Sequence, residues 1–472
     1  MRWRPTRRVA VGGVVALVAG AALAGLSIWD RTHTTCTEAF VEEPADLEQV
    51  PEEEIPQALS NLESDSGVTG PTWVANVSEP TRTILTAAGD EQIFSTSRQI
   101  TSIGADGQQR WSRATPFRPG LSVADGQAQL ITNIEGDLHL ATLDVDDGGL
   151  LRCSELAEGE PASGWVGEEG ALAFQYTDPE DQADNNDTEP VAVHRYALDG
   201  TRKWTVSGTQ PEVFGDSVPI PEMYVGTTVS AVGFRSGLDT VGYGAAGARL
   251  AEKDPAAVLW VFDSETGEVL WQVEPSAEFG EVASVLGEQD GVLYVIAAEG
   301  SRSEKRSFQF HAYDAATGKD RWSRPASPYT SMLAAEGTEI VLTELDSVIG
   351  IDASNGDELW RFPHRKPLLG SGGFTTLDPD RSGLVAQSGA SGQLVDPETG
   401  RHREVFAASS GQDDLLVSVQ DLNIRDSRLV ALVSIKNPDP DLAFTDDAYP
   451  TYLVGYDLNT SSIKLLEPKP PK

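Results

Sequence analysis

The sequence predicts an all-β fold, namely a β-propeller built from four-stranded blades. From about Thr72 onward, short alternating runs rich in Val, Ile, Thr, Tyr and Trp are separated by Asp-Gly, Asn-Gly or Thr-Gly turns. This pattern is typical of short strands joined by tight turns, and helical periodicity is nearly absent. One motif also recurs at intervals of roughly 40 to 65 residues, which in an all-β chain predicts one blade per copy.

The recurring motif contains an Asp or Asn turn, then a Gly, then a Trp four residues after the Gly. Five nearly complete copies end at Trp111, Trp204, Trp271, Trp322 and Trp360. Weaker copies start at Leu143, Val395 and Tyr456, and they carry Arg152, Glu404 and Leu465 in the Trp position. Together the copies predict eight blades, or seven if the weakest copies are closure strands.

Each part of the motif has a predicted structural role. The Asp or Asn side chain opens the turn by hydrogen bonding to its own backbone, and the Gly takes the positive φ that a hairpin bulge requires. The Trp packs between neighbouring blades, so truncating Trp271 should cost as much as a large core truncation, whereas Asp263→Asn should change little. The residues with these roles are Gly107, Trp111, Gly200, Trp204, Asp263, Gly267, Trp271, Asp314, Gly318, Trp322, Asp352, Gly356, Trp360, Asp396, Gly400 and Asp457.

The pattern aromatic-Asp-x-x-Thr/Asn-Gly-x-x-x-Trp resembles the tryptophan-docking repeat of the pyrroloquinoline-quinone-type β-propellers. That superfamily includes quinoprotein alcohol dehydrogenases and the non-enzymatic propeller lipoprotein of the outer-membrane assembly machinery, and its common ring has eight blades. The resemblance covers about residues 72–467. It implies a fold and no particular chemistry, because the repeat is scaffold.

Signatures of catalysis are missing from the sequence. Quinone-dependent members hold their cofactor against a disulfide between adjacent cysteines, and this chain has no adjacent pair. A G-x-G-x-x-G run, residues 242–247, follows no apolar strand and is interpreted as a loop. The six histidines are scattered and no G-x-S-x-G elbow occurs. We therefore expect no catalytic, cofactor-binding or metal-binding residues, and at most loosely bound calcium on acidic loops such as 178–190 and 437–447.

The N-terminal residues predict export from the cytoplasm. Residues 1–8 carry four arginines and form a short cytoplasmic end, and residues 9–29 are apolar and long enough to span a bilayer. The alternative is a cleaved signal peptide, because Ala22-Leu23-Ala24 fits a cleavage site. Residues 30–71 are predicted to be an acidic, Pro- and Glu-rich linker, 72–467 the propeller and 468–472 a tail. The protein would be single-pass in the cell membrane, or secreted if cleaved.

Charge and cysteine content constrain partners and compartment. With 73 Asp and Glu against 35 Lys and Arg, the formal net charge is -38, so the folded part repels nucleic acid. The two cysteines, Cys36 and Cys153, suggest one disulfide in an exported chain, with two unpaired thiols as the alternative.

The combined features predict a monomeric, membrane-anchored, extracytoplasmic propeller that binds a protein or peptide of the bacterial cell envelope. The longest spacings between repeats make 216–253 and 435–450 candidate recognition loops. Two alternatives are a quinoprotein-type dehydrogenase and a sensor ectodomain that works through a membrane partner.

Overall fold

The computed structural model describes most of the predicted propeller. The described residues are 38–42, 47–56, 59, 71–77, 84–88, 91–96, 98–115, 120–124, 126–134, 137–157, 161–167, 169–176, 190–209, 219–236, 258–274, 281–299, 307–327, 330–336, 339–344, 347–363, 375–377, 384–388, 391–396, 399–407, 417–425, 428–435 and 450–457. Within these ranges, no helix reaches the length and apolar character needed to cross a bilayer. The predicted spanning segment 9–29 lies outside them.

The described strands form eight antiparallel sheets, numbered here in chain order. Sheet 1 contains β3 (Ile84–Ala88), β4 (Glu91–Ser95), β5 (Gln99–Ile103) and β6 (Gln109–Ala114). Sheet 2 contains β7 (Gly120–Ala124), β8 (Gln127–Ile134), β9 (Asp137–Asp144) and β10 (Leu150–Ala157). Sheet 3 contains β11 (Pro161–Gly167), β12 (Gly170–Tyr176), β13 (Pro190–Tyr196) and β14 (Arg202–Thr209). Sheet 4 contains β15 (Pro219–Val225), β16 (Val229–Ser236), β17 (Leu259–Asp263) and β18 (Val269–Val273).

The second half of the chain continues the same pattern until the last sheet. Sheet 5 contains β19 (Glu281–Gln289), β20 (Val292–Glu299), β21 (Ser307–Asp314) and β22 (Asp320–Ala326). Sheet 6 contains β23 (Ser331–Glu336), β24 (Glu339–Thr343), β25 (Ser347–Asp352) and β26 (Glu358–Pro363). Sheet 7 contains β27 (Thr375–Leu377), β28 (Leu384–Ser388), β29 (Ser391–Val395) and β30 (His402–Ala407). Sheet 8 joins β31 (Val417–Arg425), β32 (Arg428–Ile435) and β33 (Thr451–Asp457) to β2 (Trp73–Val77) and β1 (Leu47–Gln49).

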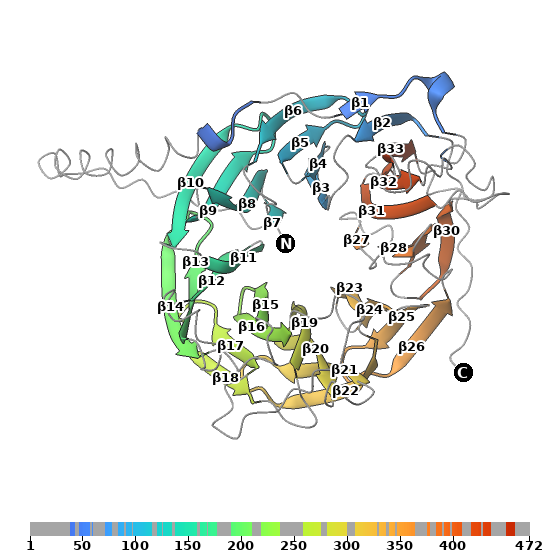
Figure 1. Cartoon of the computed structure of the whole chain (residues 1–472). Coiled ribbons are helices and arrows are strands. Elements are labelled where there is room, and N and C mark those ends of the chain that lie inside the picture. The colour runs from blue at the N-terminus through green and yellow to red at the C-terminus, as the bar shows by residue number, and fades with distance from the viewer. Residues whose placement is uncertain are drawn as a thin grey trace, which may run out of the picture.

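The sheets are arranged in a ring around a central axis (Figure 1). The first strand of each sheet is innermost, and each innermost strand contacts those of its two neighbours, including β31 with β3. The buried apolar residues form separate clusters at the junctions between adjacent sheets. The predicted all-β propeller is therefore confirmed, and its core is divided among the junctions because no single sheet can bury both of its faces.

The motif tryptophans lie at these junctions, as predicted. Trp204 in sheet 3 seats its ring against Gly267 of sheet 4, where a Cβ on the glycine would lie 2.6 Å from the indole. Its Nε1–H donates to the carbonyl of Ser264, 3.0 Å away. The same pairing of indole with next-sheet glycine occurs for Trp111 with Gly148, Trp271 with Gly318, Trp322 with Gly356 and Trp360 with Gly400.

The motif turns also have the predicted geometry. The seven motif glycines from Gly107 to Gly400 have φ between +65° and +76°. In the turn after β17, Asp263 Oδ1 accepts hydrogen bonds from the Thr266 amide at 2.7 Å and the Thr266 hydroxyl at 2.8 Å. A side chain on Gly267 would strain the backbone at its positive φ and would also displace the indole of Trp204. The glycine therefore allows both the turn and the docking of the ring.

Trp73, which has no complete motif around it, is a docking tryptophan that the sequence pattern misses. It lies on β2 opposite Gly455 of β33, the position that Trp360 holds opposite Gly350 in sheet 6. Its ring packs on Gly107, and its Nε1–H donates to Ala105 O at 3.1 Å. The last motif copy therefore receives its tryptophan from the N-terminal side, and the predicted position Leu465 lies outside the described residues.

Part of the stretch predicted as a linker packs on the ring instead. Phe40 is 6% exposed and joins the cluster between sheets 1 and 2, and the carbonyl of Val41 accepts from the amide of Ala114 at 3.0 Å. Leu59 is fully buried, and its carbonyl accepts from the Tyr456 hydroxyl at 3.2 Å. The remaining described elements are β1 and a short 3-10 helix, η1 (Glu52–Glu54). Composition predicted an extended chain, but a few apolar side chains are enough to dock it.

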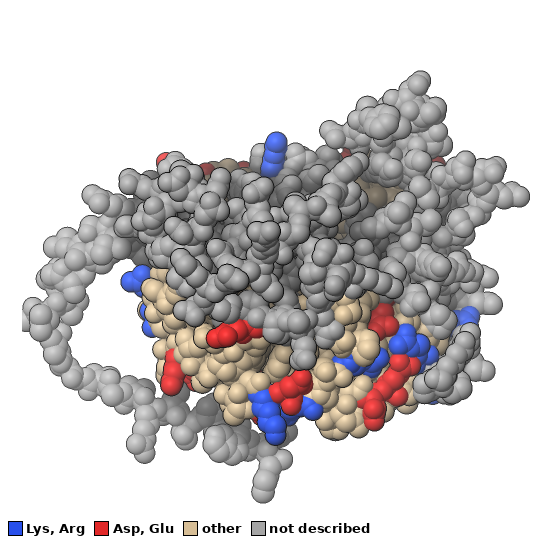
Figure 2. Space-filling view, turned by 60° about the horizontal axis from the view of Figure 1, so that its bottom comes forward, with Lys and Arg blue, Asp and Glu red and all other residues tan. Residues whose placement is uncertain are grey.

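Ion pairs lie on the outer side of the ring. Figure 2 shows basic and acidic side chains lying next to one another over the described outer surface. Lys203 and Glu265 are 2.6 Å apart and connect sheets 3 and 4, while Arg324 and Glu358 are 3.6 Å apart and connect sheets 5 and 6. Because Glu265 is largely solvated, the pair with Lys203 contributes little stability compared with the buried indoles.

Burial ranks the docking tryptophans by their expected effect on stability. Trp360 is 4% exposed, whereas Trp271 is only partly buried, so the large cost expected for Trp271 from the sequence needs correction. We predict that Trp360→Ala lowers the free energy of unfolding by about 3–5 kcal/mol and Trp271→Ala by clearly less, because less apolar area is lost. Urea unfolding measures both. Equal losses for the two variants would contradict this ranking.

The hydrogen bonds of the motif aspartates should make the stability of the fold sensitive to acid. The backbone amide of Thr266, with its hydroxyl, lowers the pKa of Asp263 below its ordinary value of 3.8. Since the folded pKa is the lower one, this stabilisation is complete above about pH 4 and is lost as pH falls through the folded pKa. Asp263→Asn should change stability little at pH 7, and its stability should fall less between pH 5 and pH 3. Urea unfolding across this range tests it, and parallel pH curves would contradict it.

Candidate functional site

A cavity of about 490 Å³ opens between the innermost strands of sheets 2 to 5. Its lining comes from β7, β11, β15 and β19 and from the turns that follow β11 and β15. Leu121, Trp165, Tyr224 and Leu286 give it apolar and aromatic walls. The size lies within the range of sites that hold a small ligand or a few side chains.

Trp165 is the most exposed large apolar side chain that the structure describes, at 52%. Side chains alternate along β11, and a Cβ on neighbouring Gly164 would touch Ile131 and Leu138 of sheet 2. Val166, on the same side as Gly164, is 5% exposed. Trp165 therefore points away from the sheet 2 junction and into the cavity, so it does not share the wedge role of the motif tryptophans.

The described part of the cavity lining contains two acidic residues. They are Glu169, in the turn between β11 and β12, and Glu222 on β15. No Lys, Arg or His is among the described residues that line it. The local charge has the same sign as the whole chain, whose formal net charge is -38.

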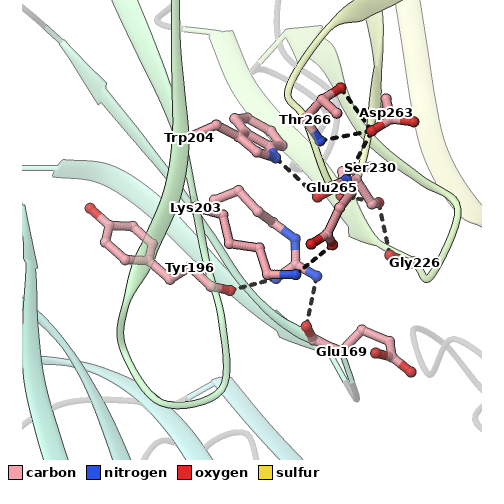
Figure 3. A network of polar contacts seen from close by, with 11 residues as sticks. Glu169, Tyr196, Lys203, Trp204, Gly226, Ser230, Asp263, Glu265 and Thr266 are labelled. Atoms are coloured by element: carbon pink, nitrogen blue, oxygen red, sulfur yellow. Dashed lines mark hydrogen bonds and ion pairs between the residues drawn. The ribbon is translucent and has the colours of Figure 1, made fainter.

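A buried arginine fixes the turn that carries Glu169 (Figure 3). Arg195 is 2% exposed, and its guanidinium donates to the carbonyl of Tyr196 at 2.5 Å and to the carbonyl of Glu169 at 2.7 Å. Gly170 makes room for this group, because a Cβ there would lie 2.1 Å from Nη1. Burial lowers the pKa of Arg195. Two charge-assisted hydrogen bonds thus hold the rim of the cavity in one conformation.

The docking motif itself holds the second rim turn, residues 226–228. Ser264 directly follows the motif residue Asp263, and its hydroxyl donates to the carbonyl of Gly226 at 2.8 Å (Figure 3). The hydroxyl of Ser230 lies 2.9 Å from the hydroxyl oxygen of Ser264, and the Ser264 amide donates to Thr228 O at 3.0 Å. Since Trp204 donates to the carbonyl of Ser264, the inter-sheet contact and the cavity rim form one network.

The predicted recognition loops are only partly described. Within 216–253, β15 and β16 occupy Pro219–Ser236, so this part is sheet and not an inserted loop. Residues 237–253 and 436–449 lie outside the described residues, as do the G-x-G-x-x-G run and most of both acidic loops. The alternation in 219–236 is the signal for these strands, because the spacing between motifs does not distinguish a loop from longer strands.

Among the described residues, no three His, Cys, Asp or Glu side chains gather in a way that could hold a metal ion. Cys153 lies on β10, is 4% exposed and is disulfide-bonded. Cys36 lies outside the described residues, so its pairing with Cys153 stays a prediction.

The ring of antiparallel sheets, joined by tryptophans on turn glycines, defines a β-propeller of the PQQ-like class. Residues 255–437 match the family model described as "Outer membrane protein assembly factor BamB". The protein of that name from Moranella endobia (strain PCIT) is 29% identical over 170 residues, which span 31% of this chain and 42% of that relative. This chain is thus a PQQ-like propeller that resembles BamB.

Solved structures show the same kind of similarity. BamB from Moraxella catarrhalis has a TM-score of 0.44 and 13% identity, over 83% of this chain and 99% of that one. The Dos1 propeller has a TM-score of 0.48 and 9% identity, over 87% of this chain and 100% of that one. Because both TM-scores lie below 0.5, the fold is established by the described strands themselves.

The cavity lining does not suit the quinone of related enzymes. Pyrroloquinoline quinone is a tricarboxylate, and the ionisable groups here are the carboxylates of Glu169 and Glu222. Carboxylates repel a tricarboxylate, and no Lys, Arg or His is among the described lining residues to compensate.

The Ser264 hydroxyl gives the cavity rim a testable support. Ser264→Ala leaves the Gly226 carbonyl without this donor, and we predict a loss of about 1 kcal/mol in the free energy of unfolding. Amide hydrogen exchange at Gly226 should also become faster. Ser230→Ala is the matched control, because it keeps the bond between Ser264 and Gly226. If exchange at Gly226 is the same in Ser264→Ala as in the unchanged protein, the rim does not depend on this hydroxyl.

Proposed function

We propose that this chain is a non-enzymatic, protein-binding scaffold of the bacterial cell envelope. The observation that carries the proposal is the cavity between β7, β11, β15 and β19, with an exposed tryptophan on a rigid rim. A cavity lined by apolar and aromatic side chains with a few polar groups is the usual form of a binding site. The resemblance to BamB supports the same class, since that relative is described as an outer membrane protein assembly factor.

The proposal includes a complete ring of eight blades that acts as a monomer outside the cytoplasm. Residues 9–29 would anchor it, and residues 1–8 would remain in the cytoplasm. Support for this orientation comes from the four arginines before the apolar run. No cofactor, metal ion or nucleic acid is required, because the propeller would act only by offering a rigid surface to which its partner binds.

Crosslinking in cells tests the scaffold proposal. A photoreactive amino acid at Thr227, which is exposed at the cavity rim, should capture one discrete envelope protein, and the complex should re-form from purified components. The same amino acid at Leu359, 41% exposed on the outer strand β26, serves as the control. Retention of pyrroloquinoline quinone with calcium, together with dehydrogenase activity, would instead favour the enzyme. Failure to form any purified complex would also contradict the scaffold.

A further inference from the structure

We propose that the cavity binds an extended peptide segment by capturing one of its basic side chains, lysine or arginine. This inference rests on the proposed scaffold function and specifies the chemistry of its partner. The capture site is formed by the aromatic rings of Trp165 and Tyr224 together with the carboxylates of Glu169 and Glu222.

The size of the cavity restricts the occupant. About 490 Å³ between four innermost strands cannot admit a folded domain. A volume of this size suits a small ligand or a few side chains. A flexible segment that inserts one or two residues satisfies this limit.

The lining favours a cation with a long apolar stem. Trp165 lines the cavity and is 52% exposed in total, and an indole face attracts ammonium and guanidinium groups. Leu121 and Leu286 offer apolar contact for methylene groups. Lysine and arginine combine both properties in one side chain.

Charge points to the same side chains. Glu169 and Glu222 are the ionisable residues of the described lining, and the chain carries a net charge of -38. This field attracts basic segments from a distance and strengthens a cation–aromatic contact inside a partly desolvated cavity. An acidic or phosphorylated segment would be repelled by the same groups.

The strand arrangement favours a peptide over a free amine. β11, β15 and β19 each terminate their sheets on the axial side of the ring. A terminal strand can pair its outer backbone groups with an added extended segment, which a small amine cannot do. A peptide therefore gains main-chain hydrogen bonds in addition to side-chain capture.

The rim is preorganised for this role. Arg195 holds the carbonyl of Glu169 at 2.7 Å, and Ser264 holds the carbonyl of Gly226 at 2.8 Å. Arg195 and Ser264 are not among the described lining residues, so they position the rim from behind it. A rigid rim reduces the entropy lost when a segment binds.

Fluorescence anisotropy with the full-length protein in mild detergent tests the proposal. The probe is a labelled Gly-Ser nonapeptide with a central arginine, and a matched peptide carries glutamate instead. We expect the arginine peptide to bind at least about tenfold more tightly, with an affinity that falls as salt rises. Trp165→Ala should weaken it about tenfold, and Glu169→Gln with Glu222→Gln should remove most of the salt dependence.

Controls separate the cavity from the general acidity of the surface. Leu359→Ala removes another exposed apolar side chain, on the outer strand β26, and should leave binding unchanged. Trp165→Ala should keep the thermal midpoint of unfolding because the side chain is largely exposed. Trp165→Phe keeps an aromatic face and should retain partial binding, so it tests the site even if Trp165→Ala folds poorly. Equal affinities for Trp165→Ala, Leu359→Ala and the unchanged protein would overturn the proposal.

Two further outcomes decide between neighbouring interpretations. Agmatine, a guanidinium without a peptide backbone, should compete only weakly, and competition as strong as that of the peptide would overturn the peptide assignment. The photoreactive amino acid at Thr227 could capture the same envelope protein equally well with and without Trp165→Ala, while no peptide binds. That result would overturn the cavity as the binding site, but it would support the scaffold function.

Discussion

An indole ring on one sheet, seated on the turn glycine of the next, is the contact on which the ring depends. No sheet has a core of its own, so stability is generated at the junctions. The indole supplies apolar area and also donates its N–H to the backbone of the neighbouring turn, as Trp322 does to Ala353 at 2.8 Å. The glycine is required twice, for its positive φ and for the absence of a Cβ beneath the ring.

The same contact extends inward to the cavity. Trp204 binds the carbonyl of Ser264, and the Ser264 hydroxyl binds the turn at Gly226 that forms part of the rim. Equivalent positions in other sheets also reach inner turns: the Val145 amide donates to Gly126 O at 3.1 Å and the Ala315 amide to Gly291 O at 2.9 Å. The docking motif therefore joins two sheets and also fixes a turn at the rim of the cavity.

The sequence predicted the features that recur in every motif copy and missed those that occur once in the chain. Five Gly-to-Trp spacings were enough for the all-β propeller fold, the turns and the position of the tryptophans between blades, because each copy obeys the same local rules. Trp73 escaped because its sheet is completed by strands from both ends of the chain, and no local spacing records that pairing. Arg195 and Tyr224 also escaped, since their importance comes from neighbours distant in sequence. Trp165 offered a signal, because it is a tryptophan without a motif around it.

Closure of the ring determines how the cavity can be presented. β1 and β2 complete sheet 8 and lie across the ring from β15 and β19 (Figure 1). Gln49 on β1 donates to the carbonyl of Gly107 at 2.7 Å, so the N-terminal segment is joined to sheet 1 as well. In the next junction Arg113 donates to Gly148 O at 2.8 Å and plays the corresponding part. The N-terminal segment therefore contacts the ring at sheets 8 and 1, on the opposite side from sheets 3 to 5. These sheets hold Trp165, Glu222 and Tyr224, so the topology separates the strands that close the ring from these lining residues of the cavity.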